Sequence, residues 1–154
     1  MSASKSLTLA IELATAKRDQ ALAQLQAMWR AHAFAQEQMS QLRQYAHETD
    51  QRWTQGAQKS TTPELLHHHY QFMERLNQAI ALQDGALGNA MQRVEAAKQA
   101  LLQTELRLAS LKQVLTHRQA GLAKLQHKRD QKQMDEFAAL QTQRQLRLQA
   151  ENQT

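Results

Sequence analysis

The sequence contains no cysteine, one proline and four glycines in 154 residues, and aromatic residues make up only 5% of it. Without cysteine there can be no disulfide, no thiolate metal site and no cysteine nucleophile. Proline and glycine are too few to break regular structure often, and the β-branched and aromatic residues that favour strands are scarce. The abundant residues are Gln, Ala, Leu, Lys and Arg, which are strong helix formers. We therefore expect an all-α protein of long helices.

Long hydrophobic runs are also missing. No stretch reaches the roughly 18 apolar residues that a membrane-spanning helix requires, so direct membrane insertion is not expected. Glu12 interrupts the short apolar patch near the N-terminus, which argues against a signal peptide. A chain of this length fits one domain, and we expect it in the cytoplasm. The net charge of +5 favours an acidic partner, although the basic residues are interleaved with acids and Gln as on an ordinary solvated coil.

Apolar residues recur every seven positions in the first third of the chain. Two such series, offset by three or four residues, hold eleven apolar residues among fourteen positions. This spacing is typical of the a and d positions of a coiled coil. The first series is Ile11, Arg18, Leu25, His32, Met39, Ala46 and Trp53, and the second is Leu7, Ala14, Ala21, Met28, Ala35, Leu42 and Thr49.

A second pair of series follows the only cluster of turn residues, GAQKSTTPE at 56–64. Gly56 can end a helix, and Thr61 or Thr62 can cap the next one, with Pro63 in its first turn. The heptad spacing continues without a shift through Gly85 and Gly88, which predicts a single helix there. All eight a positions are apolar: Met73, Ile80, Leu87, Val94, Leu101, Leu108, Leu115 and Leu122. Five of the eight d positions are apolar, and Gln83, Thr104 and Arg118 are the polar ones. The apolar five are Leu76, Ala90, Ala97, Leu111 and Leu125.

Two helices joined by a short loop run antiparallel, so the predicted fold is a long two-helix antiparallel coiled-coil hairpin. We expect helix 1 at about 5–55, a turn at 56–62 and helix 2 at about 63–148, all within one coiled-coil domain spanning 1–154. At 1.5 Å per residue, the helices would measure roughly 75 Å and 130 Å. The antiparallel pairing places Leu7, near the start of helix 1, opposite Leu108 or Leu115. Helix 2 should therefore extend unpaired beyond helix 1 from about residue 118.

This extension carries an excess of positive charge and a short apolar strip. Five basic residues stand against Asp130 alone: Arg118, Lys124, Lys128, Arg129 and Lys132. Met134, Phe137 and Ala138 follow at helical spacing and form the strip. A lone helix of this length is unstable in water without contacts. A frayed, solvated tail is one interpretation, and a docking element for another protein is the favoured one.

Two aromatic residues near the turn fall outside the predicted seam. Tyr45 and Phe72 occupy g positions, which antiparallel pairing places side by side. Gln38 and Ala79 share these positions, and Leu42 and Leu76 should lie beneath them. Either the rings widen the core of the hairpin, or they form an interaction surface of the kind that exposed apolar clusters often mark.

No catalytic or metal-binding pattern accompanies the helices. His67, His68 and His69 are consecutive, and consecutive helical residues point apart, so we expect a polar patch and no metal site. His32 is expected to set the register, and Trp29 and Trp53 to pack. A two-helix coil has no concave pocket and the chain has no phosphate-binding glycine loop, so neither an enzyme nor a cofactor is expected.

Two segments carry a resemblance to a known family. YQFMERLNQAIALQ at 70–83 and RDQKQMDEFA at 129–138, in a basic hairpin of this length, resemble flagellar type III export proteins of the FliJ family. The resemblance covers essentially the whole chain. It implies a soluble stalk like the central shaft of rotary ATPases, located in the cytoplasm at the inner-membrane face of the flagellar base.

The resemblance also implies partners and the residues that meet them. The end with both termini would enter the hexameric export ATPase FliI, and the part near the turn would meet the cytoplasmic domain of the export gate FlhA. The export chaperones FlgN and FliT are further implied partners. Thr49 and Gln83 stand at positions where relatives can have aromatic or His contacts. The outer part of the implied gate surface therefore departs from the family pattern. The residues implied for the gate are Gln38, Leu42, Tyr45, Phe72, Leu76 and Ala79. The residues expected in the ATPase ring are Lys128, Arg129, Lys132, Met134, Asp135, Glu136 and Phe137.

Two alternatives stay open at this point. The equivalent stalk of a virulence type III secretion system has the same build, and the Met-Asp-Glu-Phe block at 134–137 favours the flagellar branch. A basic coiled-coil adaptor on nucleic acid would bind with a steep salt dependence. That adaptor would make no use of Tyr45 and Phe72, so nucleic acid is not the expected partner.

Overall fold

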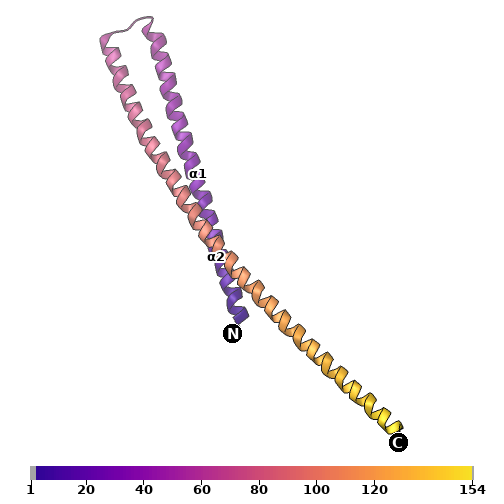
Figure 1. Ribbon diagram of the computed structural model, residues 1–154. Coiled ribbons are helices and arrows are strands. Elements are labelled where there is room, and N and C mark those ends of the chain that lie inside the picture. Colours follow the sequence, from indigo (N-terminus) through magenta and orange to yellow (C-terminus); the bar gives the residue numbers. More distant parts are fainter. Residues whose placement is uncertain (1–2, 154) are drawn as a thin grey trace. The chain divides into compact units, whose positions relative to one another are not determined.

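The computed structural model describes residues 3–153, and nearly all of them lie in two helices. Helix α1 spans Ala3–Ala57 and helix α2 spans Pro63–Asn152, with no strand in the described part of the chain (Figure 1). This confirms the predicted all-α fold of two long helices. No helix of the described residues is both long enough and apolar enough to cross a membrane.

The turn between the helices is held by a few backbone and side-chain hydrogen bonds. The Gly56 carbonyl accepts from the backbone nitrogens of Lys59 at 3.1 Å and Ser60 at 3.3 Å, which satisfies a carbonyl at the end of α1. The Thr62 hydroxyl accepts a hydrogen bond from the Leu65 nitrogen at 3.2 Å. Thr62 is thus the N-cap of α2, and Pro63 takes the first helical position, where a missing N–H is tolerated.

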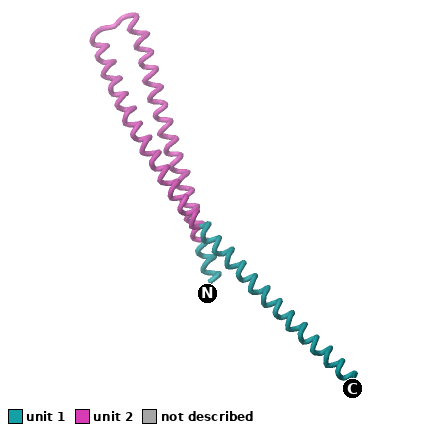
Figure 2. The backbone as a smooth tube through the Cα atoms, viewed as in Figure 1, with its two compact units in different colours: residues 1–11, 108–154 teal, residues 12–107 magenta. Residues whose placement is uncertain are grey.

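The chain divides into two compact units (Figure 2). Unit 2 consists of residues 12–107 and contains the turn, whereas unit 1 consists of residues 1–11 and 108–154. Each unit contains residues of both helices. That the whole chain acts as one coiled-coil domain stays a prediction.

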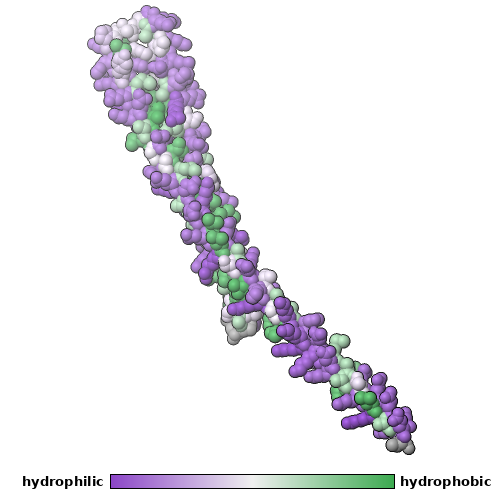
Figure 3. All heavy atoms as spheres, viewed as in Figure 1, coloured by the Kyte–Doolittle hydropathy of each residue, from purple (hydrophilic) through white to green (hydrophobic). Residues whose placement is uncertain are grey.

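Unit 2 is an antiparallel hairpin whose seam follows the heptads. Every a and d position between residues 14 and 104 that the sequence identifies is at least partly shielded, and Val94 is completely buried. Gly85 and Gly88 lie on the exposed surface of an uninterrupted helix. On the face drawn in Figure 3, hydrophobic side chains form patches between hydrophilic ones. The core of this unit is therefore the narrow seam between two helices.

Unit 1 has a short seam and a long exposed helix. Leu7 and Leu108 are buried, and Leu111 and Leu115 are partly shielded. From residue 116 to residue 153, every residue is exposed. The loss of shielding follows the end of pairing with α1, whose described residues begin at Ala3.

Candidate functional site

Three of the predicted gate residues near the turn, Gln38, Leu42 and Tyr45, line one hollow, and Tyr45 also contacts Phe72. The Tyr45 and Phe72 rings meet edge to face, with centroids 6.0 Å apart and planes at 80°. Tyr45 is half exposed and Phe72 is 39% exposed, whereas Leu76 below them is buried. We name this the Tyr45–Phe72 groove; its six residues are Gln38, Leu42, Tyr45, Phe72, Leu76 and Ala79. Leu42 and Ala79 are partly shielded and Gln38 is exposed, so the groove has an apolar floor and a partly polar edge.

A polar seam residue borders the same groove. The Gln83 side-chain nitrogen donates to the Ala35 carbonyl at 2.9 Å and lies 3.3 Å from the Gln38 side-chain oxygen. Gln83 lines a hollow of about 380 Å³ with Gln38, Gln41, Leu42 and Tyr45. A polar residue on a coiled-coil seam costs stability and fixes the register. Gln83 therefore places an amide at the border of this surface.

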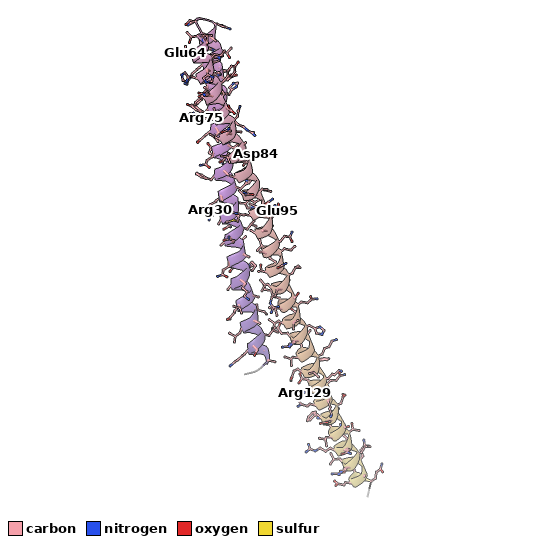
Figure 4. All side chains as sticks on the ribbon, turned by 90° about the vertical axis from the view of Figure 1, so that its left-hand side faces the viewer. Arg30, Glu64, Arg75, Asp84, Glu95 and Arg129 are labelled. Carbon is pink, nitrogen blue, oxygen red and sulfur yellow. The ribbon has the colours of Figure 1, made fainter. Side chains whose placement is uncertain are left out.

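The residues predicted to meet an ATPase lie together on α2 in unit 1. Met134 is 73% exposed and Phe137 is 63% exposed. Exposure of large apolar groups on a helix without a neighbour is typical of interaction surfaces. Figure 4 labels Arg129 on this part of α2. All seven predicted residues are exposed: Lys128, Arg129, Lys132, Met134, Asp135, Glu136 and Phe137.

The structure adds residues that the sequence interpretation missed. Phe137 and Leu140 line a shallow groove of about 270 Å³ with Gln141, Gln143, Arg144 and Arg147. Leu140 is 62% exposed, like Phe137. The signal was present as helical spacing, because Leu140 and Arg144 follow Phe137 by three and seven residues. The apolar strip thus continues toward the C-terminus and gains two arginines.

Comparison with known proteins gives a family-level match for this chain. A search of curated proteins and a search of solved structures gave no significant match. The model of the family described as "Flagellar FliJ protein" matches residues 4–147, nearly the whole chain. The chain belongs to the flagellar FliJ family. Both candidate surfaces of this FliJ-family chain fall within the matched residues, and membership gives it a role related to flagellar type III protein export.

His69 takes a position in the FliJ-family hairpin that differs from its two neighbours. Its ring stacks on Trp53 with centroids 4.3 Å apart and planes 6° from parallel. Its Nε2 lies 3.9 Å from an Asp50 carboxylate oxygen, and only 9% of its side chain is exposed. His67 and His68 are exposed and their ring centroids lie 6.4 Å apart, so of the three only His69 packs into the hairpin. Across residues 3–153, no group of three or more His, Cys, Asp or Glu residues is arranged to hold a metal ion.

Trp29 lies on the opposite side of the seam from the Tyr45–Phe72 groove, at an e position. The Lys98 ammonium sits over its ring, 5.1 Å from the centroid, and Lys98 also pairs with Glu95 at 3.2 Å. His32 meets Trp29 edge-on at 5.8 Å. Trp29 therefore does pack, but it remains 40% exposed. The contact between Trp29 and Lys98 can be predicted from the sequence, because antiparallel pairing brings e positions of the two helices side by side, as it does g positions.

Proposed function

We propose that this FliJ-family chain is the central stalk of the flagellar type III export apparatus. In this account the exposed part of α2 enters the ring of the hexameric export ATPase FliI, and the Tyr45–Phe72 groove binds the cytoplasmic domain of the export gate FlhA. The chain also receives the export chaperones FlgN and FliT. It works in the cytoplasm at the inner-membrane face of the flagellar base, and it has no catalytic role of its own.

One observation carries the proposal: shielding ends at Leu115 while α2 continues to Asn152. An isolated helix in water gains little from propensity alone and is stabilised mainly by packing. This segment nonetheless presents Met134, Phe137 and Leu140 to solvent. A partner that surrounds the helix would bury these side chains and meet the charges around them. The central pore of a ring provides such an environment.

A single stalk in a six-fold ring also supplies a mechanism. One helix with an apolar strip on one side cannot contact six identical subunits equally. A ligand shifts a conformational equilibrium by its differential affinity for the states. The subunits next to Phe137 are therefore biased toward one conformation, and binding favours the assembled ring over free subunits.

Alanine substitution on the two sides of the extension tests this proposal. Phe137→Ala should weaken binding to the ATPase at least about tenfold, the loss expected when a well-packed aromatic anchor is truncated. Leu146→Ala is the matched control, because Leu146 is 60% exposed and nine residues away, on the opposite side of the helix. Isothermal titration with the cognate ATPase measures both. Equal losses for the two variants would contradict insertion through the Phe137 side.

The virulence-system stalk is the second candidate with the same build. The family match is to the flagellar proteins, and it favours the flagellar apparatus. Complementation decides between them: the chain should restore motility to a flagellated strain of its source that lacks it. Secretion of virulence effectors with no recovery of motility would support the other system.

A further inference from the structure

The two sides of the hairpin in unit 2 differ in charge. Contacts across the helices define these sides: Tyr45 and Phe72 are both at g positions, whereas Trp29 and Lys98 are both at e positions. In an antiparallel coil, g positions and their c neighbours share one side, and e positions and their b neighbours share the other. We name the g and c positions of residues 12–107 the basic face, and the e and b positions the acidic face.

Counting the charged residues justifies these names. The basic face has five basic residues and one acidic residue, a net charge of +4, with histidines left aside. The acidic face has seven acidic and two basic residues, a net charge of −5. Figure 4 labels Arg75 of the basic face and Asp84 and Glu95 of the acidic face. The basic face holds Lys17, Arg52, Arg75, Arg93 and Arg107 with Glu48. The acidic face holds Glu12, Asp19, Asp50, Glu74, Asp84, Glu95 and Glu105 with Arg43 and Lys98.

The acidic face also carries an exposed apolar patch. Leu22 is 39% exposed, Trp29 is 40% exposed and Leu102 is 47% exposed. Leu22 precedes Trp29 by one heptad on α1, and Leu102 follows Lys98 by one turn on α2, so the patch spans both helices around the Trp29–Lys98 contact. Apolar groups gathered on the surface and rimmed by charges are typical of docking sites.

Trp29 already holds a cation within this patch. The Lys98 ammonium lies over the indole ring and is fixed by the Glu95 carboxylate. Cations are attracted to the face of an indole ring, and tryptophan is the best of the aromatic side chains in this respect. Other carboxylates of this face, such as Glu105 and Asp84, are exposed. Asp19 and Asp50 pair with Arg18 and His69, whereas no ion pair or hydrogen bond of Glu105 or Asp84 is found within the described part of the chain.

We propose that the acidic face, centred on Trp29, is a docking surface for a basic amphipathic helix of a partner protein. The apolar stripe of that helix covers Leu22, Trp29 and Leu102. Its lysines or arginines pair with the surrounding carboxylates. Among these is Glu105, which lies one heptad after Lys98 and should therefore face Leu22, one heptad before Trp29. Charge complementarity selects this partner, since an acidic helix or a nucleic acid is repelled by a net charge of −5. The proposal does not rest on the gate or ATPase assignments, which use other residues.

Two synthetic peptides and the fluorescence of Trp29 test whether the acidic face prefers a basic helix. The full chain with Trp53→Phe keeps Trp29 as its only tryptophan. Two synthetic helical peptides of about 18 residues, or about five turns, share one leucine stripe and differ only in a lysine or a glutamate polar face. The lysine peptide should shift Trp29 emission to the blue as its leucines cover the ring. It should also bind at least about tenfold more tightly than the glutamate peptide.

Charge reversal on and off the face provides the matched control. Glu105→Lys should weaken the lysine peptide at least about fivefold, whereas Glu37→Lys, the same change at an f position away from both faces, should alter it by less than about twofold. Equal affinity for the two peptides, or equal effects of the two reversals, would overturn the proposal.

Sedimentation of the unmodified chain distinguishes a second copy as the occupant. The basic face of one copy could in principle meet the acidic face of another. The proposal expects a monomer that Glu105→Lys does not change. A self-associated chain that Glu105→Lys dissociates would mean that the acidic face is an interface between copies, and would overturn the assignment to a basic helix.

Discussion

The ring of Tyr45 on α1 meets the ring of Phe72 on α2 edge to face, with their centroids 6.0 Å apart. Both rings keep a large exposed area, although Leu76 beneath them is buried. A pair of this geometry contributes about 0.5–1.5 kcal/mol beyond its buried area. This contact favours one arrangement of the two rings at the surface of the hairpin, and side chains ordered before binding lower the entropic cost of association.

Removing one ring should damage binding to the gate more than it damages the fold. Phe72→Ala should weaken binding to the FlhA cytoplasmic domain at least about tenfold, as for an aromatic anchor. Tyr70→Ala is the matched control, because Tyr70 is 64% exposed and occupies an e position on the other side. Titration with the gate domain measures both affinities. An unchanged affinity for the Phe72 variant would remove the Tyr45–Phe72 groove from the gate interface.

The stack of His69 on Trp53 should stabilise the hairpin near the turn. His69→Ala removes a ring that is almost fully covered and should lower the free energy of unfolding by about 1 kcal/mol. His68→Ala makes the same change in helix propensity at an exposed neighbour, so it should alter stability by less than about 0.5 kcal/mol. Urea unfolding followed by circular dichroism gives both values. If the two variants have equal stability, the stack contributes nothing.

Two leucines at equivalent heptad positions should differ sharply in their effect on stability. Leu108 is 4% exposed and Leu122 is 64% exposed. Leu108→Ala should cost about 2–4 kcal/mol, since it leaves a cavity in the seam. Leu122→Ala should cost less than about 0.5 kcal/mol in the free protein. Thermal and urea unfolding of both variants measures the difference, and a comparable loss for Leu122 would mean that it is packed in solution.

The heptad pattern predicts the seam of this protein well, because coiled-coil packing depends on local and strictly periodic side-chain positions. His69 lies one heptad before Leu76, so the d series predicts its burial once it is extended to the start of α2. Leu140 lies three residues after Phe137, so helical spacing carries the apolar strip beyond Ala138. The Trp29–Lys98 contact follows from the same pairing rule that brought Tyr45 and Phe72 together, applied to e positions.

Partner identity lies beyond this kind of prediction. Periodicity determines which residues face the other helix, and it says nothing of which protein covers Phe137 or Tyr45. The family match over residues 4–147 points to the flagellar export machinery in general, and the individual partners are proposals. Exposure in the structure then identifies which residues of the implied interfaces are available to a partner.

ATP hydrolysis by the cognate hexameric export ATPase tests the stalk proposal most directly. Its rate is measured alone, with the full chain, and with a chain that ends at residue 126, whose remaining hairpin is checked by thermal melting. The account predicts that the full chain stimulates hydrolysis and that the shortened chain, still cooperatively folded, does not. Equal stimulation by both, or by neither, would contradict insertion of the exposed part of α2 into the ring.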